Sequence, residues 1–173
     1  MNEKKASSHN RKKREFLKIN FNTCRDANLN DLRTLRTVDA FVRTSDGNRK
    51  HKLHRAAESG EVEIVKYLIQ NGDLVNAVNR MKWTALHWVA IKGHVDVANV
   101  LIQNGADVNA VDEDKCTALH RAAWYGSFHV VKMLLEVGTD VNAADKYKWT
   151  ALHFAVQDGH VDVAKVLIQN GAN

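Results

Sequence analysis

The sequence predicts an all-α repeat solenoid, built from helix-turn-helix units that hairpin-like loops join. Leucine-histidine pairs recur at a constant step of 33 residues, and two series of glycines keep the same step. The histidines are His54, His87, His120 and His153; the glycines are Gly60, Gly93, Gly126 and Gly159, then Gly72, Gly105, Gly138 and Gly171. Self-similarity at a fixed step of this size is typical of a repeat array.

The first half of one unit predicts a short helix. Thr84 is a favoured residue before a helix, residues 85–91 follow as the helix, and Gly93 ends it. A second helix is predicted from an apolar stripe at spacings of three and four residues. The stripe consists of Val95, Ala98, Leu101 and Ile102.

The second half of the unit predicts an exit and a connector. Gly105 stands where a helix end favours a left-handed residue, and a hairpin-like loop over residues 108–116 leads to the next pair. Isolated helices shorter than about 12 residues are marginally stable. We therefore expect stacking between units to hold the helices.

The motif within each unit resembles a known family. Residues 83–87 read Trp-Thr-Ala-Leu-His, Gly93 precedes His94, and residues 105–109 read Gly-Ala-Asp-Val-Asn. This resembles the ankyrin repeat, with its Thr-Pro-Leu-His, Gly-His and Gly-Ala-Asp-Val-Asn elements, and the resemblance extends over residues 46–173. The chain has no proline, and alanine in its place at the helix start should cost only a few tenths of a kcal/mol, roughly.

The period also predicts the domain organisation. Four repeats are expected at residues 46–78, 79–111, 112–144 and 145–173, after a degenerate N-terminal capping repeat at 16–45 and a basic, disordered arm at 1–15. An unrelated leader helix is the alternative for residues 16–45. The last repeat stops before any Val-Asn-Ala and is expected to be incomplete and uncapped, so its apolar face indicates an interface, a missing neighbour or a fraying helix.

Charge is concentrated at the N-terminus. Residues 1–18 hold seven lysines and arginines against two glutamates, and this difference of five equals the net charge of the whole chain. The arm is expected to be solubilising, with a nuclear address or contact with nucleic acid or acidic lipid as alternatives. The repeats are close to neutral and do not interleave basic and aromatic residues along a groove, which disfavours nucleic acid as the main ligand.

The cysteines and the hydropathy of the chain indicate its cellular location. Cys24 and Cys116 lie nearly three repeats apart, too far for a disulfide, so both are expected to be reduced. This favours a cytoplasmic location, with a nuclear location or export of a bacterial effector type as alternatives. No apolar run approaches the roughly 18 to 20 residues of a membrane span. A monomer is expected unless the C-terminal face pairs.

The sequence does not predict an enzyme. The resemblance implies that the repeat histidines are structural, with rings bonded to the backbone, and stacked copies are too far apart to share one metal ion. No phosphate-binding loop or nucleophile motif is present in the sequence. We predict no catalytic residues, no cofactor and no metal.

The resemblance implies that another protein is gripped by the loop tips and the exposed side of the first helices, a concave surface. The predicted protein-binding residues are Arg80, Met81, Trp83, Trp88, Lys92, Trp124, Tyr125, Lys146, Tyr147 and Trp149. The same phase also selects Gly47, Asn48, Lys50, Glu58, Ser59, Ile91, Glu113, Asp114, Cys116, Gln157 and Asp158. Exposed tryptophans are typical anchors of protein interfaces. The alternative is that Trp83 and Trp149 pack along neighbouring hairpins.

These features predict a non-catalytic protein-protein interaction module, an adaptor, scaffold or inhibitor, whose partner is a mixed-charge amphipathic segment of unknown identity. One alternative is a fragment of a longer ankyrin array or multidomain protein, including a secreted effector, that docks through the uncapped C-terminal face. Another is a nucleic-acid or nuclear-targeted factor that uses the basic arm.

Overall fold

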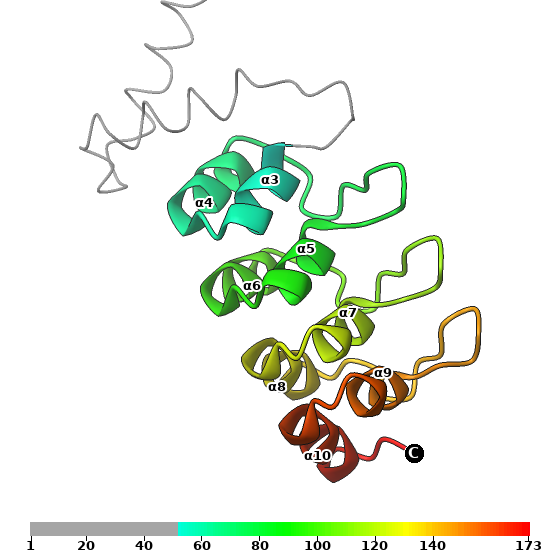
Figure 1. The fold of residues 1–173 in the computed structure, drawn as a ribbon. Coiled ribbons are helices and arrows are strands. Elements are labelled where there is room, and N and C mark those ends of the chain that lie inside the picture. The colour runs from blue at the N-terminus through cyan, green and yellow to red at the C-terminus, as the bar shows by residue number, and fades with distance from the viewer. Residues whose placement is uncertain (1–51) are drawn as a thin grey trace, which may run out of the picture. The chain divides into compact units, whose positions relative to one another are not determined.

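The computed structural model describes residues 52–173, which form eight helices in four pairs (Figure 1). The pairs are α3 (Lys52–Ser59) with α4 (Val62–Gln70), α5 (Ala85–Lys92) with α6 (Val95–Gln103), α7 (Ala118–Trp124) with α8 (Phe128–Glu136), and α9 (Ala151–Gln157) with α10 (Val161–Gln169). The predicted arm, the capping repeat and the first residues of repeat one lie outside the described residues.

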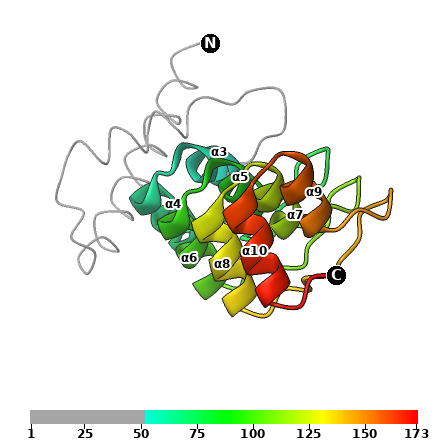
Figure 2. The same ribbon diagram turned by 60° about the horizontal axis from the view of Figure 1, so that its bottom comes forward.

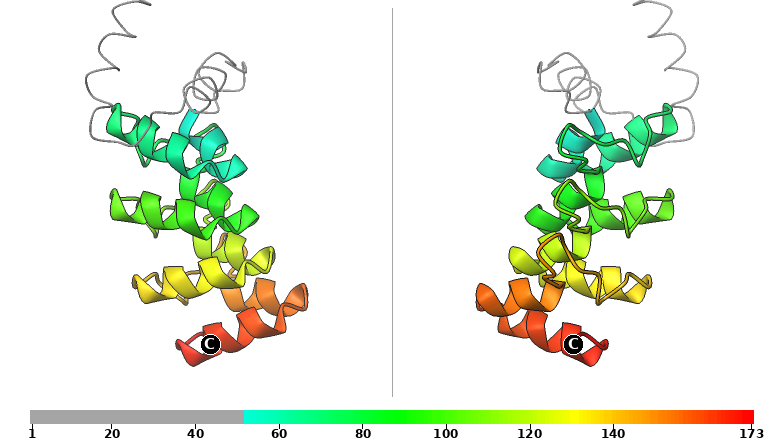
Figure 3. Two further views of the ribbon diagram at one scale, coloured as in Figure 1. Left: turned by 90° about the vertical axis from the view of Figure 1, so that its left-hand side faces the viewer. Right: turned by 90° about the vertical axis from the view of Figure 1, so that its right-hand side faces the viewer.

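The helix pairs stack in register. The first helices α3, α5, α7 and α9 contact one another in order, and the second helices α4, α6, α8 and α10 form a parallel row (Figures 1 and 3). Each pair contacts mainly the pair before and after it, as a solenoid requires. The long loops project beyond the first helices, on the side away from the second helices (Figures 1 and 2).

A threonine and the repeat histidine start α5, α7 and α9. The Thr117 N–H donates to His120 Nδ1 at 3.1 Å, and Thr117 Oγ1 accepts from the His120 N–H at 3.5 Å. The same reciprocal pair starts α5 and α9. It satisfies two backbone donors that a helix start leaves free, so the missing proline does not prevent the helix from forming.

The core is made of small and branched side chains. Ala85, Val89 and Ala90 on α5 are fully buried. The positions of Val89 and Ala90 are alanines in both α3 and α7, which lets the first helices approach closely. On α6 the predicted stripe is only partly correct, because Val97 is fully buried while Val95 and Ile102 are half-buried. A second helix contacts both its own first helix and the neighbouring second helices. Its buried face is therefore broader than one stripe.

Asparagines of the Val-Asn-Ala element join successive repeats. Asn76 Nδ2 donates to the Gly105 carbonyl at 3.0 Å, and Asn76 Oδ1 accepts from the Asp107 N–H at 2.8 Å. Asn142 makes the same two bonds with Gly171 and Asn173. Because each amide satisfies backbone groups one repeat further on, it fixes the spacing between neighbours as well as the local turn.

The connectors are tight turns, and residues 52–173 contain no strand. In each turn an Asn or Asp accepts two backbone N–H groups with one oxygen; Asp145 Oδ1 accepts from Tyr147 and Trp149, both at 2.8 Å. The Asp145 N–H also donates to the Trp149 carbonyl at 2.8 Å, which closes the turn. This agrees with the predicted hairpin-like loops. We call residues 79–83, 112–116 and 145–149 the loop tips.

The last repeat exposes side chains at positions that earlier repeats bury or half-bury. Val156 is 64% exposed, whereas Ala90 and Ala123, at the same position in repeats two and three, are fully buried. Val161 and Ile168 are 61% and 58% exposed. We call Val156, Val161 and Ile168 the outer face of the last repeat.

Candidate functional site

All ten predicted protein-binding residues lie on the first helices, at their ends, or in the loop tips. They differ in exposure. Tyr147 is 69% exposed, Tyr125 54%, Met81 46%, Trp124 40% and Trp149 36%. Arg80, Lys92 and Lys146 are also exposed, whereas Trp83 and Trp88 are half-buried. The set therefore divides into exposed side chains and a partly covered base.

The base belongs to a row of aromatic rings, bridged by Arg121, that crosses three repeats. The centroid of Trp88 lies 4.8 Å from that of Trp83. The guanidinium carbon of Arg121 lies 5.0 Å from the Trp83 centroid and 5.5 Å from that of Trp124, within the range of a cation–π interaction. We call Trp88, Trp83, Arg121, Trp124, Phe154 and Trp149 the aromatic row.

The row continues into the last repeat through Phe154. Its ring stacks on Trp124 with centroids 5.2 Å apart and planes 21° apart, and Trp149 meets its edge at 5.3 Å. Aromatic pairs of this geometry contribute about 0.5–1.5 kcal/mol each beyond area burial. Trp83 and Trp124 are therefore held in place by neighbours from other repeats, and Trp88 and Trp149 by rings of their own repeats, before any partner binds.

A buried ion pair fixes the centre of the row. Arg121 is 7% exposed and Asp112 is 3% exposed. Both the Nε and an Nη group of Arg121 donate to Asp112 Oδ2, the former at 3.2 Å. The other oxygen, Asp112 Oδ1, accepts from the Asp114 N–H at 2.8 Å and the Cys116 N–H at 3.0 Å. The carboxylate thus ties the loop tip of repeat three to α7, and a paired guanidinium is kept between two indole rings.

Sequence reasoning missed Arg121, Asp112 and Phe154. A signal was available, because Arg55, Trp88, Arg121 and Phe154 occupy one repeat position and alternate between cation and aromatic ring. Neighbouring first helices bring this position into one line, so alternation favours stacking along the row.

Cys116 corrects the wider set of expected surface positions. It is the last residue of the loop tip of repeat three, as Trp149 is of the loop tip of repeat four, but it is only 2% exposed. Burial raises the pKa of its thiol to about 12, so the thiol stays protonated. The short side chain does not reach the surface that tryptophan reaches from the equivalent position. Trp83 contacts Trp88 on α5 and Arg121 on α7, which are both residues of first helices.

Charges at the loop tips are partly paired. Lys146 Nζ lies 2.5 Å from Asp114 Oδ1 and 4.8 Å from the Tyr147 ring centroid. The hydrogen bond from Lys146 lowers the pKa of the Asp114 carboxyl, and the same bond raises the pKa of Lys146. This pair joins the loop tips of repeats three and four.

The repeat histidines position the loops that carry the site. His87 Nδ1 accepts from the Thr84 N–H at 3.2 Å, so Nε2 carries the proton and donates to the Cys116 carbonyl at 3.1 Å. His120 Nε2 is 3.2 Å from the Trp149 carbonyl in the same way. Burial lowers the pKa of both His87 and His120. These rings are neutral bridges from one first helix to the base of the next loop tip.

A family comparison agrees with this architecture. A family model described as ankyrin repeats (many copies) matches residues 53–102, 86–135 and 126–168. The chain belongs to the ankyrin-repeat family. No curated protein matches the sequence significantly. Ankyrin repeats are generally protein-interaction modules and are typically non-catalytic.

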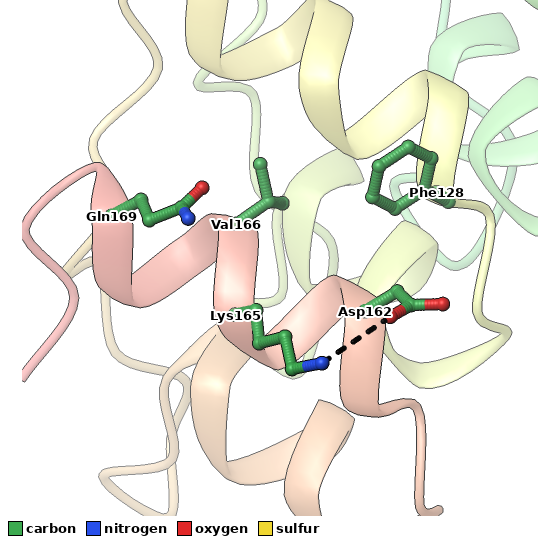
Figure 4. A pocket seen from close by; sticks show the side chains of 5 residues that line it. All are labelled: Phe128, Asp162, Lys165, Val166 and Gln169. Carbon is green, nitrogen blue, oxygen red and sulfur yellow. Dashed lines mark ion pairs between the residues drawn. The ribbon is translucent and has the colours of Figure 1, made fainter.

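Other surfaces of this ankyrin array have fewer features of a binding site. A shallow groove of about 260 Å³ lies between α8 and α10, lined by Phe128, Asp162, Lys165, Val166 and Gln169 (Figure 4). Its two charged groups face each other, with Lys165 Nζ 3.8 Å from Asp162 Oδ1. In the described part of the chain, no cluster of three or more His, Cys, Asp or Glu side chains could hold a metal ion. None of the helices in residues 52–173 has the length and apolar character to cross a bilayer.

Proposed function

We propose that this ankyrin-repeat chain is a non-catalytic adaptor, scaffold or inhibitor that binds a partner protein through its loop tips and first helices. The binding face consists of Met81, Trp124, Tyr125, Tyr147 and Trp149, above the rest of the aromatic row. The single observation that carries the proposal is that these large side chains are exposed on a base that rings and an ion pair already order. Rigid aromatic anchors lose little conformational freedom on binding.

A cytoplasmic location is part of the proposal. Cys116 is a free, buried thiol, as is usual for proteins of a reducing compartment. A partner in that compartment would bind the chain with its Cys116 thiol reduced.

The test is capture of partners from cell lysate by the parent chain and by a variant with Tyr125→Ser and Tyr147→Ser. Both side chains are more than half exposed, so their removal should leave the fold intact. The matched control is Leu74→Ser with Val137→Ser, which removes exposed apolar side chains elsewhere. We expect the first variant alone to lose a captured protein, by about tenfold or more. Equal capture by all three chains would contradict the proposal.

A second candidate is docking through the outer face of the last repeat. The observation that favours it is the exposure of Val156, Val161 and Ile168, at positions that earlier repeats half-bury or bury. An Ile168→Asp variant distinguishes the two proposals. Loss of capture by this variant, with normal capture by the Tyr125 and Tyr147 variant, would favour the second candidate.

A further inference from the structure

Three lysines occupy a backbone conformation that disfavours them. Lys82, Lys115 and Lys148 have φ angles of 57°, 62° and 70°, one in each loop tip, and all three are exposed. Glycine and asparagine adopt this left-handed conformation at a lower free-energy cost than lysine does. Lysine is therefore kept at the same point of three turns against a local preference.

Copying of repeats does not fully explain the three lysines. The tips of repeats two and four are similar, but the tip of repeat three has Glu113, Asp114 and Cys116 where repeat two has Arg80, Met81 and Trp83. Lys115 is retained although its neighbours all differ. Lysine in a strained backbone conformation in three loop tips, with different neighbours in one of them, indicates a role for the side chain.

The charges of these lysines are not neutralised within the described residues. Between residues 52 and 173, no ion pair is formed by Lys82, Lys115, Lys148 or Arg80, whereas Lys146 and Arg121 are each paired with a carboxylate. Glu113 is an exposed carboxylate of the loop tips, and it forms no ion pair within residues 52–173. Asp145, which is buried in the tip of repeat four, also has no ion-pair partner within residues 52–173. Four cations against two carboxylates leave an excess of two positive charges. We call these four cations the cationic ridge.

The ridge borders the aromatic row. Trp83 and Trp149 directly follow Lys82 and Lys148 in the chain. Neighbouring tips are also joined by backbone bonds, from the Glu113 N–H to the Met81 carbonyl at 3.2 Å and from the Lys146 N–H to the Asp114 carbonyl at 2.9 Å. The tips thus form one continuous edge, with positive charge beside exposed apolar rings.

The ring contacts favour a protein ligand over a nucleic acid. Single-stranded nucleic acids bind by stacking bases on free aromatic faces. Here Arg121 lies over the rings of Trp83 and Trp124, and Trp124 is stacked with Phe154. The exposed parts of these rings can pack against apolar side chains of a protein ligand. The cations of the ridge can pair with its carboxylates.

We propose that the partner presents an acidic segment, whose apolar side chains pack on the binding face and whose Asp or Glu side chains pair with the cationic ridge. This rests on the proposed function and specifies the chemistry of its partner. It replaces the mixed-charge segment expected from sequence, because the structure pairs Lys146 with Asp114 and leaves the ridge cations for the partner.

The test is selection from a phage-displayed library of random dodecapeptides. One bait is the parent chain, and another carries Lys82→Asn, Lys115→Asn and Lys148→Asn, since asparagine removes the charge and tolerates the left-handed backbone. The matched control bait carries Lys66→Asn, Lys132→Asn and Lys165→Asn, which removes the same charge from the second helices. Thermal melts establish that all three baits are folded.

We expect the parent and control baits to enrich peptides rich in Asp, Glu and apolar residues, and the ridge variant to lose the acidic enrichment. A synthetic acidic peptide from the selection should bind the ridge variant about tenfold more weakly, and salt should weaken its binding to the parent. Neutral or basic peptides, no enriched peptides, or equal acidic enrichment by all baits would overturn the inference. So would tip-dependent binding of a dT20 oligonucleotide that exceeds binding of the peptide.

The proposed function can survive that failure. Non-acidic peptides that bind the parent and lose binding on Tyr125→Ser with Tyr147→Ser would keep the binding face while rejecting the acidic partner. Acidic peptides that depend on the ridge but not on these tyrosines would support the ridge and reject the binding face.

Discussion

Two histidines outside the repeated Leu-His pair join neighbouring repeats through a very close contact. His160 Nε2 is 3.0 Å from the Trp124 carbonyl, and His94 Nε2 is 3.1 Å from the Glu58 carbonyl. Each ring lies directly against a glycine of the preceding repeat. A Cβ added to Gly126 would lie 2.6 Å from the His160 ring. The glycine is required there by the neighbouring ring as well as by its own turn.

We expect Gly126→Ala to destabilise the chain more than Gly159→Ala. Both glycines have positive φ angles, 68° and 73°, so either alanine should cost about 1 kcal/mol of backbone strain. Only Gly126→Ala must also displace the His160 ring and its hydrogen bond, which adds about 1–3 kcal/mol. Urea unfolding of the two variants measures the difference; equal losses would show that the ring contact is unimportant.

The buried repeat histidines predict a dependence of stability on pH. Burial lowers the pKa of His87 and His120 in the folded chain below the ordinary value of 6.5, so between the two values the unfolded chain binds more protons. Stability is therefore fully present above about pH 6.5 and falls as the pH drops towards the folded pKa values. Unfolding free energies at pH 7.5, 6 and 5 measure this. A chain that is equally stable or more stable at pH 5 would contradict it.

At this scale the sequence predicted positions better than environments. The repeat phase located Cys116 in the loop tip of repeat three. It could not show that a short side chain there is buried while Trp149 at the equivalent position reaches the surface. The resemblance did imply that the ring of His87 bonds to backbone, and the structure confirms it. The difference is that a hydrogen bond to the backbone repeats with the period, whereas burial depends on the size of non-repeating neighbours.

At the scale of elements, one buried ion pair connects the loop tip of repeat three to α7. Asp112 and Arg121 are both almost fully buried. Repeat two has Asn79 and Trp88 at the same two positions. Asn79 Oδ1 still accepts the Met81 and Trp83 N–H groups, both at 2.9 Å. The turn therefore requires an oxygen acceptor rather than a charge.

We expect Arg121→Met to destabilise the chain by about 3–5 kcal/mol, because it leaves the Asp112 carboxylate buried without its cation. Adding Asp112→Asn should recover most of this loss, since asparagine keeps the turn and methionine packs well between aromatic rings. A double-mutant cycle by chemical denaturation measures the coupling. Losses that simply add would contradict a role for the ion pair.

Helix bounds were largely predictable, and the aromatic row was not. Residues 85–91 were expected as a helix, and α5 runs from Ala85 to Lys92 before Gly93. The threonine start and glycine stop are local signals, so they can be read from one repeat. The stacking of Arg121 on Trp83 and Trp124 joins residues of different repeats, and it depends on how neighbouring first helices are set side by side.

At the scale of the whole array, stability should decline towards the last repeat. Each helix pair is stabilised mainly by its neighbours. The outer face of the last repeat is exposed, and α9 and α10 bury fewer apolar side chains than α5 to α8. The repeat count followed from the 33-residue period, but the extent of this exposure required the packed structure.

We therefore expect backbone amides of α9 and α10 to exchange with deuterium faster than those of α5 to α8. Local opening of a helix pair that buries fewer apolar side chains exposes less buried surface and costs less free energy. Exchange followed by mass spectrometry of peptides from each helix measures this. Uniform protection across the four pairs would contradict nearest-neighbour stabilisation.

The most direct test of the binding face is site-specific photocrosslinking in cells. A photoreactive phenylalanine analogue replaces, one at a time, Tyr125 and Tyr147 on the binding face, Lys132 on α8, or Ile168 on the outer face of the last repeat. We expect the same partner protein to be crosslinked from positions 125 and 147 and from neither of the others. Crosslinks only from position 132 or 168 would place the partner elsewhere and contradict the proposed binding face.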